Sequence, residues 1–183
     1  IAIILDGNRR WASKHFLEPW MGHQYGAKKI EDLLGWCLDL GVKSVTLYAF
    51  STENFQRSPQ EVDEIMRIAE EKLKKLLTDE NIHKHEVQVK VIGRLNLLPE
   101  SLQRAIKDVE RATRDYDKHF LNVAVAYGGR AEIVDAAKEI AQMVERGELT
   151  PKDIDEETFE RYLYTAHMPK QDPDLIIRTS GEE

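Results

Sequence analysis

Short apolar segments alternate along the chain with longer segments in which apolar residues recur every three or four positions. The short segments are rich in β-branched residues, as β-strands are. They predict strands over 1–5, 44–50, 87–92, 120–127 and 175–177. Strands separated by helices of this length are typical of βαβ units, whose strands run parallel and whose helices cover both faces of the sheet. The predicted fold class is therefore α/β, with a mostly parallel central sheet.

The clearest helical pattern begins at Pro59 and ends near Leu77. Ser58 is a suitable N-cap, and Glu61 is placed to complete a capping box. Three further helices are predicted, one ending at Gly41, one beginning at Pro99 and one ending at Gly147. The residues expected to face the core are Ile30, Leu33, Leu34, Cys37 and Leu40 in the first, Leu102, Ala105, Ile106, Val109 and Ala112 in the second, and Ile133, Ala136, Ala137, Ile140 and Val144 in the third.

Composition narrows the possible partners. The 183 residues suit one domain, and 26 Lys and Arg against 33 Asp and Glu give a net charge of -7, so a nucleic-acid partner is not expected. The single cysteine, Cys37, excludes an internal disulfide and fits a reducing, cytoplasmic setting. We expect one catalytic domain over 1–183 whose two ends are trimmed, because the chain starts within an apolar run and stops abruptly at Glu183.

Polar residues, glycines and arginines follow every predicted strand. In a parallel sheet the ends of the strands meet at one edge, where ligands bind. The segments that would gather there are 6–10, 51–57, 93–94, 128–130 and 178–181. Arginine forks and glycine N–H groups bind phosphate oxygens, so this edge predicts a diphosphate site. Asp6 would repel that ligand unless a cation lay between them, and Mg²⁺ is the cation that carboxylates and phosphates share.

Two observations bear on this interpretation. Asp-Gly-Asn is also an ordinary turn sequence, and surface arginines after strands are common, so the structural alternative stays open. The chain contains neither G-x-x-x-x-G-K-[ST] nor G-x-G-x-x-G after a strand, which disfavours an ATPase or a dinucleotide enzyme.

Five stretches together resemble one family. They are LDGNRRWA at 5–12, GHQYG at 22–26, LYAFSTENFQR at 47–57, AYGGR at 126–130 and DLIIRTSGE at 174–182. Their order and spacing resemble those of the cis-prenyltransferases, the undecaprenyl and dehydrodolichyl diphosphate synthases, over essentially the whole chain. Arg9, Ser-Thr-Glu-Asn-Phe and the Thr179-Ser180 pair look more like the archaeal and eukaryotic branch.

The resemblance implies a butterfly-like fold, a homodimer, Mg²⁺ and a hydrophobic cleft for the growing chain. It implies condensation of isopentenyl diphosphate with an allylic diphosphate, farnesyl or geranylgeranyl, to give a Z-configured polyprenyl diphosphate. A lipid product would bring peripheral contact with a membrane. Met66, Ala69 and Leu73 could line the cleft or simply pack in the core.

Carried over by position, the resemblance implies that Asp6 is a catalytic residue and the Mg²⁺ ligand, and that Arg178, with Ser180, binds isopentenyl diphosphate. The residues implied for the allylic diphosphate are Gly7, Asn8, Arg9, Arg10, Trp11 and His23. A mobile loop that positions isopentenyl diphosphate corresponds to Ser51, Glu53, Asn54, Phe55 and Arg57, with Asn54 as a candidate catalytic residue. Either a relay through Asn54 or the leaving diphosphate would remove the proton.

Two departures from the family pattern leave another function class open. Pro19 stands where the family usually has a basic residue, and the sequence ends before the second isopentenyl diphosphate arginine and a glutamate linked to Mg²⁺ binding. A non-catalytic or partner-dependent subunit of a prenyltransferase complex is therefore the alternative. A trans-prenyltransferase is disfavoured, because no D-D-x-x-D occurs.

Overall fold

The computed structural model describes residues 1–180; Gly181 and Glu182 of the last matched stretch, and Glu183, lie outside the described residues. Within the described part, five parallel strands form one sheet in the order β3-β4-β2-β1-β5. The strands are β1 (Ala2–Ile4), β2 (Ser44–Ser51), β3 (Val87–Ile92), β4 (His119–Tyr127) and β5 (Ile176–Arg178). Each predicted strand is confirmed to within one residue at either end, and so is the α/β fold class with its parallel sheet.

The helices follow the strands in chain order, as βαβ units require. They are α1 (Asn8–Lys14), α2 (Pro19–Asp39), α3 (Pro59–Leu76), α4 (Glu80–Lys84), α5 (Glu100–Thr113), α6 (Gly129–Glu145) and α7 (Glu156–Glu160), with short 3₁₀ turns η1 (Thr52–Gln56), η2 (Leu95–Leu97) and η3 (Pro151–Asp153). Among the described residues, no helix is both long and apolar enough to cross a membrane.

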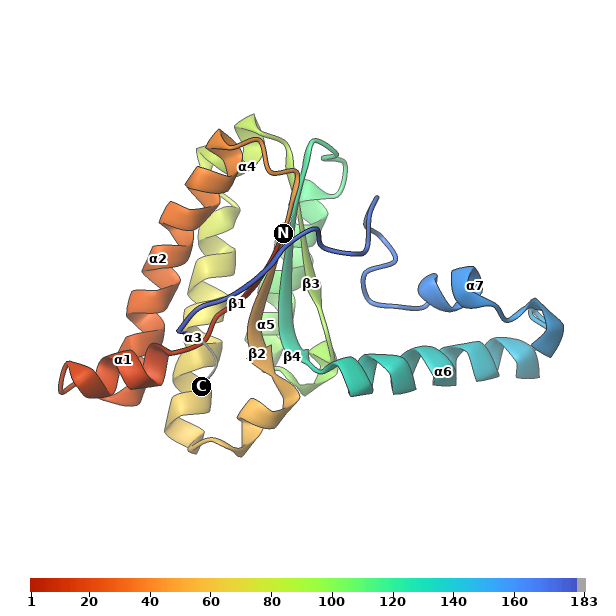
Figure 1. Cartoon of the computed structure of the whole chain (residues 1–183), viewed down its shortest axis with the longest axis horizontal. Helices are drawn as coiled ribbons and strands as arrows, with labels where there is room; N and C mark the ends of the chain where they lie inside the picture. Colours follow the sequence, from red (N-terminus) through yellow and green to blue (C-terminus); the bar gives the residue numbers. More distant parts are fainter. Residues whose placement is uncertain (181–183) are drawn as a thin grey trace.

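The main core lies between the sheet and a layer formed by α2, α3 and α5 (Figure 1). Alternate strand residues such as Ile3, Leu47 and Val89 point into this layer and are almost completely buried. Met66 and Leu73 of α3 belong to the same core, so here they pack between helix and sheet. The apolar periodicity of α3 therefore describes its buried face.

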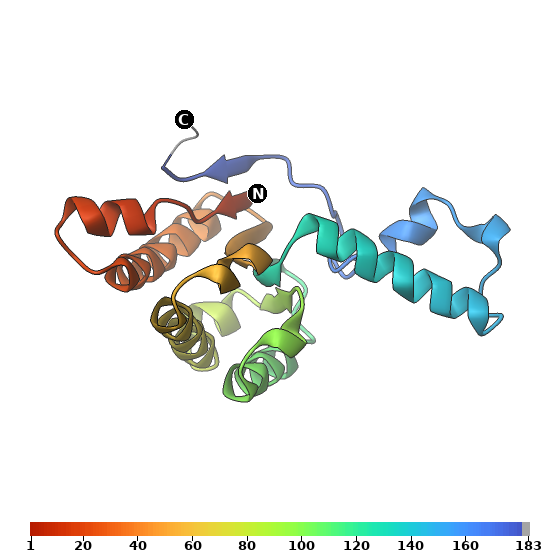
Figure 2. The same ribbon diagram turned by 90° about the horizontal axis from the view of Figure 1, so that it is seen from below.

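The opposite face of the sheet is covered less evenly. Helix α6 begins at the end of β4 and projects away from the sheet, together with α7, as an arm (Figures 1 and 2). Ile133, expected to face the core, is 55% exposed, and Ala137 is exposed as well. That part of the prediction is wrong, because periodicity identifies an apolar face but not whether a sheet lies beneath it.

Two other core assignments fail at helix ends. Leu40 caps the C-terminus of α2 and is 80% exposed, because it lies beyond the last turn that contacts the core. Ala112 is exposed, whereas its neighbour Thr113 is fully buried. The Thr113 hydroxyl donates to the carbonyl of Val109 at 2.9 Å and accepts from the N–H of Val89 at 3.1 Å, so hydrogen bonding permits a polar residue there.

Candidate active site

Asp6 follows β1, and its carboxylate contacts an arginine from each end of the chain. Oδ2 accepts from Arg10 Nη2 at 3.2 Å and from Arg178 Nε at 3.0 Å, while Oδ1 accepts from the N–H of Gly7 at 2.6 Å. These groups meet because β1 lies beside β5 in the sheet, with Ile4 paired to Arg178. The structure thus brings together three residues predicted for the diphosphate site from positions 172 residues apart.

The pKa of Asp6 reflects this setting. Partial burial acts to raise the pKa of the carboxyl, but hydrogen bonds from Arg178 and the Gly7 N–H, together with the charge of Arg10, hold it below its ordinary value. Asp6 is therefore ionised at neutral pH and can bind a cation or orient arginines.

The loops after β1 and β5 fit closely against each other. The Thr179 hydroxyl accepts from the N–H of Asp6 at 2.9 Å and donates to the carbonyl of Asp6 at 2.7 Å. Gly7 adopts φ +92°, and a Cβ there would lie 2.4 Å from the Cβ of Ser180. Glycine is thus required at position 7 by both backbone conformation and space. Sequence reasoning assigned Thr179 no role, although a hydroxyl beside the predicted ligand Ser180 was a signal.

A second cluster forms around Glu61 of α3, whose side chain is only 4% exposed. Its Oε1 lies 3.0 Å from His23 Nε2 and accepts from Arg57 Nη1 at 2.9 Å, and Arg9 Nε is 3.7 Å away. Three residues predicted to bind substrate, from α1, α2 and the end of η1, therefore converge on one buried carboxylate. Sequence reasoning treated Glu61 only as half of a capping box.

That capping box is only half formed. The Ser58 hydroxyl accepts from the N–H of Glu61 at 3.4 Å, as expected, but the Glu61 carboxylate turns to the cationic cluster. Burial acts to raise the pKa of Glu61, yet His23, Arg57 and Arg9 hold it below its ordinary value.

His23 titrates below its ordinary range. Burial lowers its pKa, Glu61 counteracts this, and the charge of Arg57 adds to the lowering. His23 is therefore neutral at neutral pH, with one ring nitrogen facing both Glu61 and Arg57. A neutral imidazole can donate to a phosphate oxygen without adding charge to the cluster.

The glycines of the GHQYG stretch let α1 approach α2. A Cβ at Gly22 would lie 2.1 Å from the backbone carbonyl oxygen of Asn8, and one at Gly26 would lie 2.5 Å from the side-chain oxygen of Asn8. These two glycines, four residues apart on one face of α2, leave the space in which the first turn of α1 lies against α2. Arg9 and Arg10, adjacent in that turn, reach the Glu61 and Asp6 clusters respectively.

The loop after β2 is built largely by the residues predicted to bind substrate. Ser51 and Asn54 form a reciprocal capping box of η1, in which the Asn54 side-chain oxygen accepts from the N–H of Ser51 at 3.1 Å. Phe55 packs edge-on against Phe50, with ring centroids 4.9 Å apart, and so anchors the loop to the core. Glu53 remains exposed. These contacts fix the shape of the loop and place Arg57 at the Glu61 cluster.

Other residues named from the sequence lie elsewhere. Trp11 stacks on His15 at 4.2 Å and tilts against Tyr25 at 4.7 Å, on the exposed side of α1. Arg94, which follows β3, forms a bidentate pair with Asp135 at 2.8 and 2.9 Å. The strands are parallel, so their ends do meet at one edge of the sheet, as predicted. Some of the arginines at this edge contact Asp6 or Glu61, whereas Arg94 pairs with Asp135.

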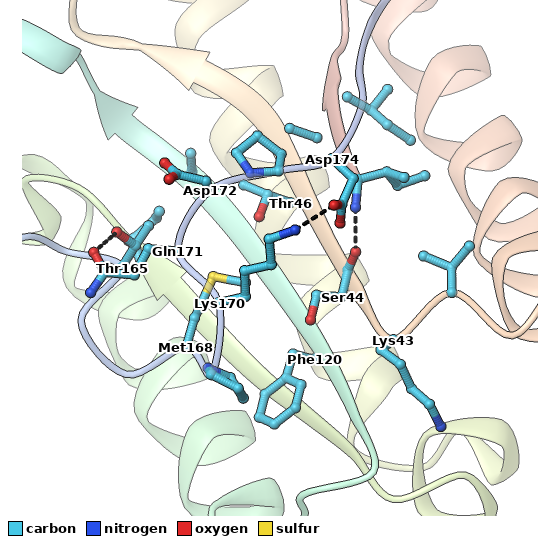
Figure 3. A pocket seen from close by; sticks show the side chains of 18 of the residues that line it. Lys43, Ser44, Thr46, Phe120, Thr165, Met168, Lys170, Gln171, Asp172 and Asp174 are labelled. Atoms are coloured by element: carbon cyan, nitrogen blue, oxygen red, sulfur yellow. Dashed lines mark hydrogen bonds and ion pairs between the residues drawn. The ribbon is translucent and has the colours of Figure 1, made fainter.

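A cavity lies on the other face of the sheet. It measures about 1020 Å³ and is lined by strand residues, including Thr46 and Phe120, and by the segment 165–174 (Figure 3). Figure 3 shows Met168 and Lys170 over the strands, with Lys170 paired to Asp174. None of the predicted substrate-binding residues within the described chain lines this cavity. We therefore place the candidate site at the charged clusters around Asp6 and Glu61 and not in the cavity.

The described residues contain no group of three or more His, Cys, Asp or Glu side chains placed to hold a metal ion. A single carboxylate such as Asp6 still suits Mg²⁺, which commonly binds one or two carboxylates and completes its shell with substrate phosphates and water. The donor set therefore fits a cation shared with a phosphate ligand.

Comparisons with known proteins agree with this chemistry. The family described as "Putative undecaprenyl diphosphate synthase" matches residues 4–183. The "Tritrans,polycis-undecaprenyl-diphosphate synthase (geranylgeranyl-diphosphate specific)" of Pyrococcus horikoshii is 56% identical over 182 residues, covering 100% of this chain and 68% of the relative. The protein of that name from Methanopyrus kandleri is 57% identical over 183 residues, covering 100% and 67%. These relatives fit the archaeal branch.

Solved structures are similar as well. The lavandulyl diphosphate synthase of Lavandula x intermedia, in complex with dimethylallyl diphosphate, has a TM-score of 0.92 at 42% identity, covering 100% of this chain and 77% of that chain. A probable undecaprenyl diphosphate synthase from Campylobacter jejuni has a TM-score of 0.74 at 30% identity, covering 100% and 75%. The arrangement of helices and strands is therefore shared with both.

Proposed function

The chain belongs to the undecaprenyl diphosphate synthase family of cis-prenyltransferases, and from that premise we propose that it extends geranylgeranyl diphosphate with isopentenyl diphosphate, using Mg²⁺. The product is a Z-configured polyprenyl diphosphate. The starter is the one named for the archaeal relatives at 56% and 57% identity. Farnesyl diphosphate, the other starter considered, is the comparison in the test below.

One structural observation carries the proposal: Asp6 contacts Arg10 and Arg178 with the same carboxylate oxygen. Arg10 lies in the turn assigned to the allylic diphosphate, and Arg178, the last residue of β5, is assigned to isopentenyl diphosphate. Two diphosphates bound by these arginines would meet across Asp6. A condensation needs this arrangement, because its two substrates must react with each other.

The proposed roles follow from position. For the allylic diphosphate we assign Gly7, Asn8, Arg9, Arg10 and His23, with Trp11 beside them on α1. For isopentenyl diphosphate we assign Arg178, Ser180 and the loop residues Ser51, Glu53, Asn54, Phe55 and Arg57. Glu61 orients Arg57 and His23, because both contact its Oε1.

The reaction breaks the allylic C–O bond, forms a C–C bond to the double bond of isopentenyl diphosphate, and releases one proton. Arg10 donates hydrogen bonds to the leaving diphosphate as its negative charge develops. Asp6 is the residue that would hold Mg²⁺, which when bound withdraws further charge from the leaving group. Asn54 does not serve as the base, since its amide is neutral and its oxygen already accepts from Ser51. The departing diphosphate takes the proton.

The proposal includes a homodimer located in the cytoplasm. The family resemblance supports this assembly, and so does the unevenly covered sheet face, whose hollow of about 1020 Å³ is bordered by apolar strand residues. A size measurement by light scattering at several protein concentrations tests it.

The first experiment measures incorporation of labelled isopentenyl diphosphate by the purified full-length protein with geranylgeranyl or farnesyl diphosphate, with and without Mg²⁺. Asp6→Ala is compared with Asp63→Ala, which removes an exposed aspartate of α3. We expect elongated Z-products that require Mg²⁺, retained in Asp63→Ala and lost in Asp6→Ala. Absence of incorporation with either starter, restored by a second protein, would instead establish the partner-dependent subunit.

A further inference from the structure

Thr179 holds the main chain of Asp6 at the end of β5. The N–H of Thr179 donates to the carbonyl of Ile4 at 3.1 Å, which continues the pairing of β5 with β1 one residue past Arg178. At the next step the side chain replaces the backbone, because the Thr179 hydroxyl accepts from the N–H of Asp6 at 2.9 Å and donates to its carbonyl at 2.7 Å. One hydroxyl therefore binds both main-chain polar groups of Asp6.

The residue before Thr179 holds the side chain of Asp6. Arg178 Nε donates to the carboxylate oxygen Oδ2 at 3.0 Å, while Thr179 binds the backbone of the same residue. Thr179 is exposed, so water can satisfy the N–H and the carbonyl of Asp6 when the hydroxyl is removed. Water does not join Asp6 to β5, however. The hydroxyl is therefore needed to fix where the Asp6 backbone lies relative to Arg178, and less to satisfy its hydrogen bonds.

The same two loops are also in close steric contact. Ser180 adopts φ +78°, a left-handed conformation in which a residue other than glycine is strained. Its Cβ lies only 2.4 Å from the point that a Cβ on Gly7 would occupy. Such strain persists only where the surrounding structure over-determines the conformation. The turn at 179–180 is therefore held in one arrangement against residues 6–7, and the Thr179 hydroxyl is part of what holds it.

We infer that Thr179 is a positioning residue for the reaction, which acts through Asp6 and sets the place of its carboxylate. That carboxylate is shared by Arg10 and Arg178, so a displacement of its backbone changes the contact with both arginines. The hydroxyl is the active group in this role. The methyl group contributes by restricting the side-chain rotamer, as β-branching does in general.

The inference rests on the proposed function for the identity of the ligand and for the cation that Asp6 would hold. A carboxylate that shares Mg²⁺ with a phosphate must be placed accurately, because this cation requires nearly ideal octahedral geometry. Residues that orient a metal ligand typically change metal affinity or activity by about 10–100-fold when they are replaced. The loss expected without the hydroxyl is therefore large enough to measure, and it should depend on the cation.

Two substitutions separate the hydroxyl from the methyl group. Thr179→Val keeps the shape of the side chain and removes the hydroxyl, whereas Thr179→Ser keeps the hydroxyl. Binding of geranylgeranyl diphosphate to the full-length protein is measured by isothermal titration calorimetry without isopentenyl diphosphate, so that no condensation occurs. Each titration is made in Mg²⁺ and again in EDTA. Thr78→Val is the matched control, since Thr78 is an exposed threonine whose hydroxyl donates to the carbonyl of Lys75 at 3.4 Å.

We expect Thr179→Val to weaken binding by about tenfold in Mg²⁺ and by less than about twofold in EDTA, because only the ligand that shares a cation with Asp6 depends on the place of the carboxylate. Thr179→Ser should stay within about threefold of the parent, since it loses only the restriction of the rotamer. Thr78→Val should bind like the parent in both conditions. Thermal unfolding of every variant checks that it is folded.

Equal binding by Thr179→Val and the parent in Mg²⁺ overturns the inference. So does an equal loss in Mg²⁺ and in EDTA, which would show a general displacement of the loops, and so does binding by the parent that is independent of Mg²⁺. A Thr179→Ser variant as weak as Thr179→Val would show that the methyl group and not the hydroxyl acts. Condensation by the parent is measured separately, and Mg²⁺-dependent binding without condensation refutes only the proposed function.

Discussion

Glu61→Gln is the substitution that most directly tests the organisation of the second cluster. Glutamine keeps the shape of the side chain and an acceptor oxygen but removes the charge that His23 and Arg57 contact at 3.0 and 2.9 Å. A hydrogen bond to a charged group contributes about 1.5–3 kcal/mol, against about 1 kcal/mol for a neutral one. Two weakened bonds predict a loss of about 1–4 kcal/mol, with a midpoint of about 2.5 kcal/mol, in the free energy of unfolding.

The third contact adds little to this sum. Arg9 Nε is 3.7 Å from Glu61 and its side chain is 57% exposed, so water screens the pair. For a chain of this size the loss corresponds to a decrease in melting temperature of about 5–10 °C. We also expect KM for the diphosphate substrates to rise by about tenfold, because Arg57 and His23 lose the group that orients them.

The pH dependence has a definite sign. Since the pKa of Glu61 is held below its ordinary value, the stabilisation is complete at neutral pH and is lost as the pH falls through the lowered pKa. Urea denaturation of parent and variant at pH 7 should therefore differ, and the difference should shrink as the pH falls below the ordinary range of a glutamate carboxyl and through the lowered pKa of Glu61. Glu71→Gln, which affects an exposed pair on the same helix, is the control and should stay within about 0.5 kcal/mol of the parent. Equal behaviour of the two variants would refute the assignment of Glu61 as the organising charge.

The contact of Asn8 with Gly22 and Gly26, and the Arg94–Asp135 pair on α6, give further predictions. Gly22→Ala sets a Cβ against the backbone carbonyl of Asn8, so we expect a loss of about 2 kcal/mol or more in urea denaturation. Gly26→Ala meets only the movable Asn8 side chain, so stability should change little while kcat/KM for condensation falls about tenfold. A larger loss of stability in Gly26→Ala than in Gly22→Ala would contradict this account of the contact between α1 and α2. The pKa of Asp135 is lowered to about 2 by its hydrogen bonds from Arg94 and Tyr164. Asp135→Asn should therefore cost about 1 kcal/mol at pH 7 and progressively less between pH 4 and about pH 2, measured by denaturation across that range.

Local signals were sufficient for the strands and for the four long helices α2, α3, α5 and α6, but they did not predict the short helices α1, α4 and α7. The β-branched runs predicted the strands to within one residue, because short apolar segments between helices have few alternatives in an α/β chain. The same rules predicted that Asp6 and Arg178 would lie at one edge, since all parallel strands end there. The family motifs added the substrate class, which periodicity alone does not contain.

The local signals did not predict which side chains from different strands and helices form ion pairs. The partners of Arg94 and Glu61 depend on which strand lies beside which and on how a helix is rotated, and neither is written in local patterns. The exposed Ile133 shows the same limit, because an apolar face on a helix does not reveal whether a sheet lies under it.

The sequence by itself determined the strands, the four long helices, the parallel edge and the presence of an acid among arginines, because these follow from residue type and spacing. Only the tertiary structure decided that Arg10 and Arg178 share the Asp6 carboxylate, and that Arg9, His23 and Arg57 surround Glu61. The physical reason is that a charge acts over a few ångströms, and distances of that size between remote residues exist only once the sheet has set β1 beside β5 and α1 against α2.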